Sequence, residues 1–318
     1  MVGAHVSTLR APAPRRAGTV GYDFGGHDGV MTAEPKRPRI VVVGSLNHDI
    51  AVRLPRFPAV DETLIAHDLT EFRGGKGYNQ ATAISRLGAA ATMVGCLGND
   101  GAGELLRDGL RHSGIDDRFV TVVGAHTGTA LPLITDRGEV SIVIVPGANA
   151  ALTPALVDAA AEAFTDAAAL LLQGEVPVAA SLRAAELARG VGARVVVNPA
   201  PVGPGCGELV DAADLVVVNR VEAETLGLSP SWRVVVTLGA DGVIAGDTRV
   251  PAFRADVVDP TGAGDAFCAA LTYALTMGHD LASAVRFGAA AGACAVQRLG
   301  AEPGLPTLDE VKAMLATA

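Results

Sequence analysis

The 318-residue sequence is poor in aromatic residues and lacks the cysteine and histidine spacings typical of metal sites. Aromatic side chains make up only 4% of the chain, and no H-E-x-x-H or C-x-x-C pattern occurs. The four cysteines, Cys96, Cys206, Cys268 and Cys294, lie far apart in the sequence. We therefore expect neither a zinc site nor a disulfide framework, but buried thiols in a reducing cytoplasm.

Long apolar runs and basic runs are lacking as well. No stretch approaches the ~20 apolar residues that a membrane span requires. The 25 Lys and Arg against 34 Asp and Glu give a net charge of −9, and no basic run follows residue 39. We therefore expect neither a membrane nor a nucleic acid as a partner, and any anionic substrate would need local hydrogen-bond donors.

Residues 1–38 show no periodicity and are rich in proline, glycine and arginine. They contain no apolar core of a secretory signal. We interpret them as a disordered extension, or as the result of a start codon upstream of a more natural one at Met31. The folded domain is expected at residues 39–318.

What the chain does have is a regular alternation of apolar strands and helical segments. Residues 39–47 form a continuous apolar run typical of a buried parallel strand, and from residue 153 strands alternate with helices. This order predicts an α/β fold with a doubly wound, mainly parallel sheet. Segments at 48–72 and 127–146 alternate instead, and predict a small antiparallel β lid. Further strands are predicted within 62–72 and at 250–258.

Two polar loops follow the early strands, and strand ends in such sheets share the edge where ligands bind. In "SLNHD", Asn47 and Asp49 lie on one side of an extended segment, which suits the hydroxyls of a polyol; a simple polar turn is the alternative. In "RGGKGYNQ", residues 73–80, three glycines around Lys76 allow close backbone approach. It is not a P-loop, because GxxxxGK[ST] is absent, and a flexible turn with a solvated lysine is the alternative.

Two more polar loops follow the later strands. Asn219 and Glu222 in "NRVE" fit either a helix capping box or the water shell of a nucleotide-bound Mg²⁺. In "DPTGAGD", residues 259–265, consecutive N–H groups at a helix start would stabilise an anion, and Asp265 could accept a hydroxyl proton. A turn followed by an N-cap is the simpler interpretation. A carboxylate beside an anion cradle suits phosphoryl transfer to an alcohol.

The segments "GGKGYNQATAISRLGA" and "DPTGAGDAFCAALTYAL" resemble the two signature regions of the ribokinase family, the PfkB-type carbohydrate kinases. The resemblance runs from about Arg39 to the C-terminus. It implies a ribokinase-like α/β kinase domain, a homodimer through the β lid, and ATP-dependent phosphorylation of a sugar hydroxymethyl group. D-ribose is the expected acceptor; deoxyribose, a ketohexose, a nucleoside, or a non-catalytic sugar-binding role are the alternatives.

The resemblance also implies a role for each motif residue. Asp265 becomes the base, and the anion hole comprises Gly262, Ala263 and Gly264. The sugar contacts are Asn47, Asp49, Gly75, Lys76, Asn79 and Glu175. Mg²⁺ and ATP are assigned to Asn219, Glu222, Thr237, Gly239 and Gly264. A monovalent cation, K⁺, is assigned to Asp259 and Thr261 with backbone groups of Ala295, Arg298 and Gly300.

Four positions depart from the pattern that the resemblance implies, and one of them, Pro260 in place of a threonine, is a change that other family members share. Tyr78 stands where family members usually carry a small residue, and we predict that its ring narrows the sugar pocket. Arg220 replaces a glutamate and reverses a charge near the phosphates. Gly304 replaces a serine near the cation, which predicts a weaker dependence on K⁺.

Overall fold

The computed structural model describes residues 37–317, so the interpretation of residues 1–36 as an extension or an upstream start lies outside the described residues. A nine-stranded sheet has the order β13-β12-β11-β10-β9-β8-β1-β4-β5, and it is parallel except for the antiparallel β11-β12-β13 end. Its strands are β1 (Arg39–Val43), β4 (Ala90–Gly98), β5 (Asp116–Val123), β8 (Ala167–Gln173), β9 (Arg194–Asn198), β10 (Leu215–Asn219), β11 (Val234–Thr237), β12 (Val243–Ala245) and β13 (Thr248–Val250).

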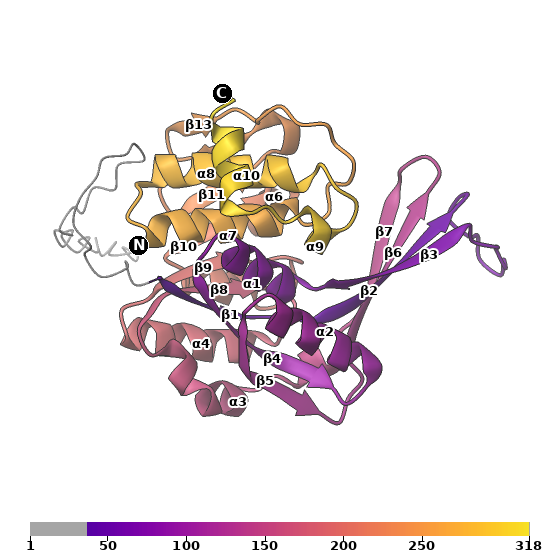
Figure 1. Ribbon diagram of the computed structural model, residues 1–318, viewed down its shortest axis with the longest axis horizontal. Helices are drawn as coiled ribbons and strands as arrows, with labels where there is room; N and C mark the ends of the chain where they lie inside the picture. The colour runs from indigo at the N-terminus through magenta and orange to yellow at the C-terminus, as the bar shows by residue number, and fades with distance from the viewer. Residues whose placement is uncertain (1–36, 318) are drawn as a thin grey trace, which may run out of the picture. The chain divides into compact units, whose positions relative to one another are not determined.

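Helices cover both faces of this sheet (Figure 1). The α-helices are α1 (Lys76–Arg86), α2 (Gly101–His112), α3 (Pro154–Ala159), α4 (Val178–Gly190), α5 (Cys206–Asp211), α6 (Arg220–Leu226), α7 (Ala263–Thr276), α8 (Leu281–Ala295), α9 (Ala301–Gly304) and α10 (Leu308–Leu315). Short 3-10 turns are η1 (Gly147–Ala151), η2 (Ala161–Phe164) and η3 (Gly239–Asp241).

The alternation of side chains along β1 explains the two layers. Ile40 and Val42 point to a core with α1, α7 and α8, whereas Val41 and Val43 point to a second core with α3 and α4. A strand that is buried on both faces reads as a continuous apolar run, which is why this element was recognisable from the sequence. The predicted doubly wound, mainly parallel fold is confirmed.

A second, four-stranded sheet projects from the main domain and is called the lid sheet here (Figure 1). It has the order β3-β2-β6-β7, formed by β2 (Asn47–Leu54), β3 (Asp68–Gly74), β6 (Gly128–Thr135) and β7 (Val140–Val145). The β2–β3 and β6–β7 pairs are antiparallel, as predicted, whereas β2 and β6 run parallel. Both strands leave the same edge of the main sheet, after β1 and β5, and so point the same way.

Two local predictions need correction, and one strand was not predicted. The strand predicted within 62–72 begins only at Asp68, and Ile65 before it is 87% exposed. Residues 251–258 are not a strand; instead, the N–H groups of Val258 and Asp259 both donate to the carbonyl of Val296. The edge strand β5 had no counterpart in the prediction, because its polar start does not form an apolar run.

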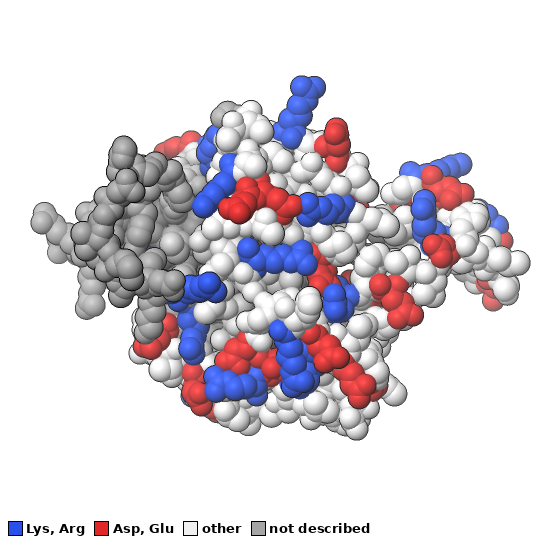
Figure 2. Space-filling view, viewed as in Figure 1, with Lys and Arg blue, Asp and Glu red and all other residues white. Residues whose placement is uncertain are grey.

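Acidic and basic side chains interleave on the surface seen in Figure 2, so no basic area marks that face. Among residues 37–317, no helix is both long and apolar enough to cross a bilayer.

Candidate active site

Most of the predicted site residues gather near the carboxyl end of β1. This strand lies between β4 and β8. The strands β4 and β5 follow it on one side and β8, β9 and β10 on the other, so the strand order reverses at β1. Such a switch point opens a crevice beyond the strand ends, where ligands of doubly wound folds bind. Ser45 and Asn47 follow β1, and Glu175 follows β8.

Asp265, the third residue of α7, is buried and held by two amide groups from α1. Asn79 Nδ2 donates to its Oδ2 over 2.9 Å, and Gln80 Nε2 donates to its Oδ1 over 3.0 Å. Gln173 Nε2 in turn donates to Gln80 Oε1 over 2.7 Å. The carboxylate is therefore fixed in orientation, while each oxygen keeps a lone pair that can accept a proton.

The start of α7 offers the backbone donors that the sequence predicted. Gly262 has φ 81°, and a Cβ there would lie 3.0 Å from Ala301, so a glycine is needed at this turn. The first N–H groups of a helix lack an intrahelical acceptor, and the helix dipole adds partial positive charge. Ala263 N–H already donates to the carbonyl of Pro260, whereas the space beside Gly264 is open. Gly262 and Gly264 are therefore the better placed donors.

The first group of predicted sugar contacts lies at the root of the lid sheet. Asn47 is buried and its Oδ1 accepts from Asn149 Nδ2 over 2.7 Å. The Asp49 carboxylate lies over Gly74, where a Cβ would come within 2.1 Å of its Oδ2. Gly75 has φ 89°, and a Cβ there would lie 2.8 Å from the Asn47 nitrogen. The glycines thus let both side chains sit against the start of α1.

Glu175 joins the loop after β8 to the same corner. Its carboxylate accepts from Ser45 Oγ and, over 3.1 Å, from the backbone N–H of Lys76. Burial lowers the pKa of Lys76, but the carboxylates of Asp265, Glu175 and Glu222 more than offset this, so its pKa is raised. Lys76 consequently remains a cation among carboxylates.

Asp49, Asn79 and Gln173 each have a buried side-chain oxygen in this site without a hydrogen-bond partner. Asp49 Oδ1 and Asn79 Oδ1 are buried and accept no hydrogen bond from the protein. Burial, together with the charges of Glu175 and Asp265, raises the pKa of Asp49 to about 7. An unpaired buried acceptor is destabilising, and hydroxyl groups of a ligand would satisfy both atoms.

The residues assigned to Mg²⁺ and ATP lie at the ends of β10 and β11. Asn219 and Thr237 are register partners, and Gly239 opens the η3 turn with φ 60°. Asn219 Oδ1 accepts from the Glu222 N–H, and Glu222 Oε2 accepts from the Asn219 N–H, so the capping-box interpretation is confirmed. Arg220 forms an ion pair of 2.7 Å with Asp241 in η3.

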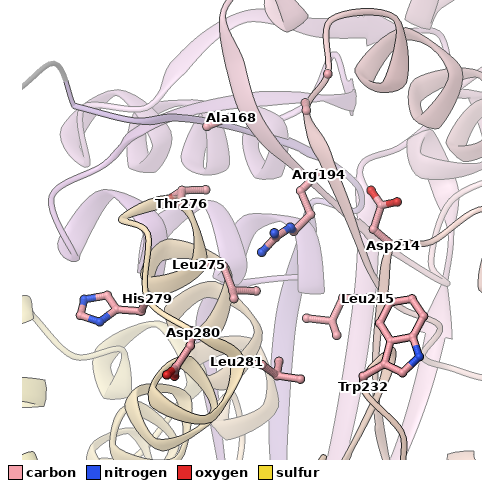
Figure 3. Close-up of a pocket in the computed structure, with 12 residues that line it drawn as sticks. Ala168, Arg194, Asp214, Leu215, Trp232, Leu275, Thr276, His279, Asp280 and Leu281 are labelled. Atoms are coloured by element: carbon pink, nitrogen blue, oxygen red, sulfur yellow. The ribbon is translucent and has the colours of Figure 1, made fainter. Parts of the chain in front are cut away.

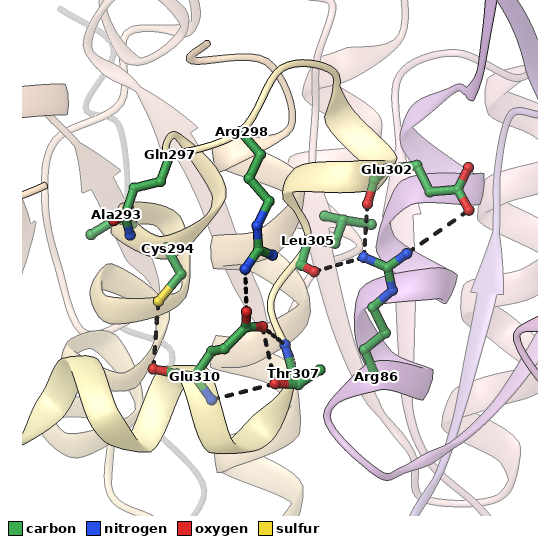
Figure 4. Close-up of polar contacts among 9 residues, drawn as sticks. All are labelled: Arg86, Ala293, Cys294, Gln297, Arg298, Glu302, Leu305, Thr307 and Glu310. Atoms are coloured by element: carbon green, nitrogen blue, oxygen red, sulfur yellow. Dashed lines mark hydrogen bonds and ion pairs between the residues drawn. The ribbon is translucent and has the colours of Figure 1, made fainter. Parts of the chain in front are cut away.

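The residues assigned to the monovalent cation also come together. Asp259 Oδ1 accepts from the N–H and hydroxyl of Thr261, and its Oδ2 accepts from the Gly300 N–H over 2.8 Å. The side chain of Arg298 binds Glu310 of α10 (Figure 4). Gly304 packs against Ala295, where a Cβ would lie 2.5 Å from the carbonyl oxygen. The name cation turn is used below for the five residues assigned to the cation: Asp259, Thr261, Ala295, Arg298 and Gly300.

The prediction for Tyr78 is wrong. Its side chain is fully buried in the core that includes α1 and α2, and its hydroxyl lies 3.4 Å from Glu302 Oε1. A Cβ on Gly109 of α2 would come within 2.2 Å of that hydroxyl. The ring therefore fills the space between α1 and α2 rather than narrowing a sugar pocket.

A cavity of about 720 Å³ lies elsewhere, beside the amino ends of β8, β9 and β10 (Figure 3). Arg194, Asp214 and Trp232 are among the residues that line it, together with Leu275 and Leu281 of α7 and α8. None of the predicted site residues contributes to this lining. The cavity is therefore distinct from the site around Asp265.

Comparison with known proteins identifies the family of this chain. The family model described as pfkB family carbohydrate kinase matches residues 37–308. The chain belongs to this family. It is 35% identical over 292 residues to ribokinase of Bacillus subtilis, covering 87% of this chain and 99% of that protein. With ribokinase of Lactococcus lactis it is 33% identical over 291 residues, 87% of this chain and 97% of that protein.

A solved ribokinase shares the fold of this pfkB family kinase. The structure of Arabidopsis thaliana ribokinase in complex with ribose and ATP matches with a TM-score of 0.78 and 32% sequence identity. The match covers 88% of this chain and 99% of that one. The ribokinase-like fold expected from the sequence is thus confirmed.

Sequence reasoning missed four residues of the site in this family member: Gln80, Gln173, Asn149 and Ser45. Ser45 and Gln80 lie within motifs already singled out, and Gln173 lies two residues before Glu175. The sequence separation is nevertheless 93 residues between Gln173 and Gln80, and 185 residues between Gln80 and Asp265. Gly44 belongs with them, since a Cβ there would lie 1.8 Å from Gln173 Oε1. Only the fold reveals these pairings.

The raised pKa of Asp49 predicts a pH-dependent stability. Because ionisation of Asp49 is unfavourable in the folded protein, the carboxyl keeps its proton up to about pH 7, whereas the unfolded chain loses it near pH 4. The contribution of Asp49 to stability therefore falls as the pH rises from about 4 to about 7. Replacing Asp49→Asn removes this penalty above pH 7. After discounting for solvent screening, the gain is on the order of 1–2 kcal/mol, or about 2–8 °C in Tm at pH 8, and vanishes near pH 4.

Thermal unfolding of both proteins between pH 4 and pH 8 measures this difference. Asp68→Asn, at an exposed carboxylate where β3 begins, is the matched control and should show no such window. A Tm difference for Asp49→Asn that does not change with pH would contradict the prediction.

Proposed function

We propose that this kinase transfers the γ-phosphoryl group of ATP to the O5 hydroxyl of D-ribose. The observation that carries the proposal is the pair of unpaired buried acceptors, Asp49 Oδ1 and Asn79 Oδ1, beside the Asp265 carboxylate. Hydroxyl groups of a sugar would pair with these acceptors and bring one further hydroxyl to Asp265. The curated relatives named ribokinase, and the related ribokinase solved with ribose and ATP, support ribose as the acceptor.

In the proposed reaction Asp265 acts as the general base. One of its oxygens accepts the proton of the O5 hydroxyl as O5 forms a bond to the γ-phosphorus, and the bond from that phosphorus to the ADP oxygen breaks. The amides of Asn79 and Gln80 keep the carboxylate aimed during this step. The N–H groups of Gly262 and Gly264 at the start of α7 would stabilise the negative charge on the transferred group.

We further propose that Asn219 and Glu222 hold Mg²⁺ through its water shell, with Thr237, Gly239 and Gly264 around the nucleotide. One carboxylate and one amide suit Mg²⁺, which keeps several waters beside nucleotide phosphates. When bound, Mg²⁺ would neutralise phosphate charge. The capping box uses one oxygen of each side chain in this role, which leaves the other oxygen of Glu222 for a water ligand.

The cation turn is proposed to bind K⁺ through oxygen atoms alone. Within residues 37–317, no three His, Cys, Asp or Glu side chains gather closely enough to hold a metal ion. Asp259 supplies a carboxylate, and Ala295, Arg298 and Gly300 supply backbone carbonyls, a donor set that suits a hard cation. When bound, K⁺ would add positive charge behind the anion hole, because Gly262 packs against Ala301 beside Gly300.

A homodimer through the lid sheet is also proposed. The edge strand β7 pairs on one side only, and all six of its residues are exposed. Five of them are aliphatic, from Ile144 at 38% to Ile142 at 55% exposure. An edge strand that is apolar and unpaired is prone to join another chain, and a second copy presents the same surface in return.

We also propose a cytoplasmic location. The four cysteines are buried and unpaired, as expected of a protein in a reducing compartment. Activity that persists unchanged under strong thiol reductant is consistent with this proposal.

The substrate assignment predicts the ranking of acceptors. With ATP and Mg²⁺, ADP release should show the highest kcat/KM for D-ribose, at least about tenfold above deoxyribose, because a missing hydroxyl leaves a buried acceptor unpaired. The panel includes a ketohexose and a nucleoside. If the nucleoside has the highest kcat/KM, the proposed substrate is wrong. If no acceptor is phosphorylated, the kinase proposal is wrong.

Replacing Asp265→Asn should lower kcat about 10²–10⁴-fold, the usual scale for loss of a general base. Sugar affinity, measured by calorimetry, should be largely kept, because the amide is close in size. Asp309→Asn, at an exposed carboxylate of α10, serves as the control. Near-normal turnover of Asp265→Asn would exclude this residue as the base.

Replacing Ile142→Lys should convert the proposed dimer to a monomer, because it places a charge on the apolar edge of β7. Light scattering after size exclusion gives the mass directly. Val191→Lys, at a similarly exposed aliphatic position after α4, is the control and should stay dimeric. A wild-type protein that is monomeric would contradict the proposal.

A further inference from the structure

A half-buried cluster of charges ties the lid sheet to the cation turn. Arg73 of β3 donates through Nε to Glu302 Oε2 over 2.8 Å and through Nη2 to Glu302 Oε1 over 3.1 Å. The two residues are 229 positions apart in the sequence. This two-point contact fixes both distance and angle, as a single ammonium group would not.

The Glu302 side chain is only 11% exposed and is held from several sides. The hydroxyl of Tyr78 lies 3.4 Å from its Oε1, and Arg86 Nη2 lies 3.9 Å from the same oxygen. Arg86 also donates to the carbonyls of Glu302 and Leu305, as Figure 4 shows. Burial and the nearby Glu302 raise the pKa of Tyr78, so the hydroxyl keeps its proton.

The neighbouring helix accommodates this cluster. A Cβ on Gly109 of α2 would lie 2.2 Å from the Tyr78 hydroxyl and 2.6 Å from Arg73 Cδ. Tyr78, Arg73 and Gly109 therefore fit one another, and the tyrosine that departs from the family pattern has a place in this contact rather than in the sugar site.

Three consecutive residues beside the cluster reach three different parts of the site. Gly300 N–H donates to Asp259, Ala301 packs against Gly262 at the start of α7, and Glu302 binds Arg73. The ring of Phe72, next to Arg73, also covers Gly300, where a Cβ would come within 2.7 Å of it. Residues 300–302 thus form a junction between the cation turn, the anion hole and β3.

The other end of this connection lies under the sugar site. Arg73 precedes Gly74, and Gly74 lies against the Asp49 carboxylate. A displacement of β3 would therefore move the surface on which Asp49 rests. Separating the ion pair would leave a half-buried charge without its partner, which is costly, so β3 and residues 300–302 should move together.

We propose that Arg73 and Glu302, supported by Tyr78, are positioning residues that couple the lid sheet to the cation turn. Occupancy of the cation turn by K⁺ then favours one placement of β3 and raises the affinity for the sugar, and by linkage the sugar raises the affinity for K⁺ equally. The sugar half of this proposal rests on the proposed substrate, and the K⁺ half rests on the proposed K⁺ site.

The first test follows backbone amide exchange in β3, residues 68–74, by hydrogen–deuterium exchange without sugar. The wild-type protein in KCl should exchange more slowly there than in choline chloride of equal ionic strength. The Arg73→Met/Glu302→Gln variant should lose this difference. Arg183→Gln, which breaks exposed ion pairs of α4 with Asp158 of α3 and with Glu186 of α4 itself, should keep it. No effect of K⁺ on β3 in the wild-type protein overturns the proposal.

The second test measures the dissociation constant of ribose by calorimetry in the two salts. K⁺ should tighten binding by about 5–20-fold in the wild-type protein and the control, the usual range of coupling between sites. It should tighten binding less than about twofold in the double variant. Glu302→Gln alone and Tyr78→Phe keep the side-chain shapes and should give intermediate ratios, so a misfolded double variant does not remove the test.

The outcomes separate the two proposals. A ratio that is the same in all variants overturns the coupling, even if the protein phosphorylates ribose. If ribose does not bind in either salt while K⁺ still protects β3 only when Arg73 and Glu302 are present, the substrate proposal fails and the coupling stands.

Discussion

The site depends on the contact between the Asp265 carboxylate and the amides of Asn79 and Gln80. It joins α7 to α1 through a buried position where an isolated carboxylate would be strongly destabilising. Gln173 extends the contact to the end of β8, and Gly44 leaves it the room to do so. Four separate parts of the chain are thereby held in one arrangement around a single charge.

Three carboxyl groups and one ammonium group lie close together in this corner, an arrangement that binding or catalysis explains and stability does not. The charges of Glu175 and Asp265 disfavour ionisation of Asp49. Lys76 is the cation beside them, and Asp265, Glu175 and Glu222 raise its pKa. Such an arrangement lowers stability in exchange for oriented acceptors, a common feature of active sites. Gly74 and Gly75 contribute to the same arrangement, because they let the carboxylate and amide groups approach the backbone closely.

The sequence allowed the main sheet and the motif residues to be predicted because both leave local signals. Continuous apolar runs such as 39–43 mark strands buried on two faces, and the spacing of Asn219 and Glu222 marks a helix start. Strand β5 was not predicted because polar residues interrupt its apolar pattern. A strand was wrongly predicted at residues 251–258 because this loop contains several apolar residues. Nothing local shows which side of α1 Tyr78 faces, or that Arg73 meets Glu302 across 229 positions.

The capping box at the start of α6 has a consequence for nucleotide affinity. Asn219 and Glu222 satisfy each other's backbone N–H groups, so this turn is ordered by the protein alone. A ligand arriving at the ends of β10 and β11 does not have to restrict that backbone and loses no binding energy to its conformational entropy. Removing either side chain would shift that entropic cost onto the ligand, so nucleotide binding would weaken by more than the side chain's own interaction with the ligand contributes.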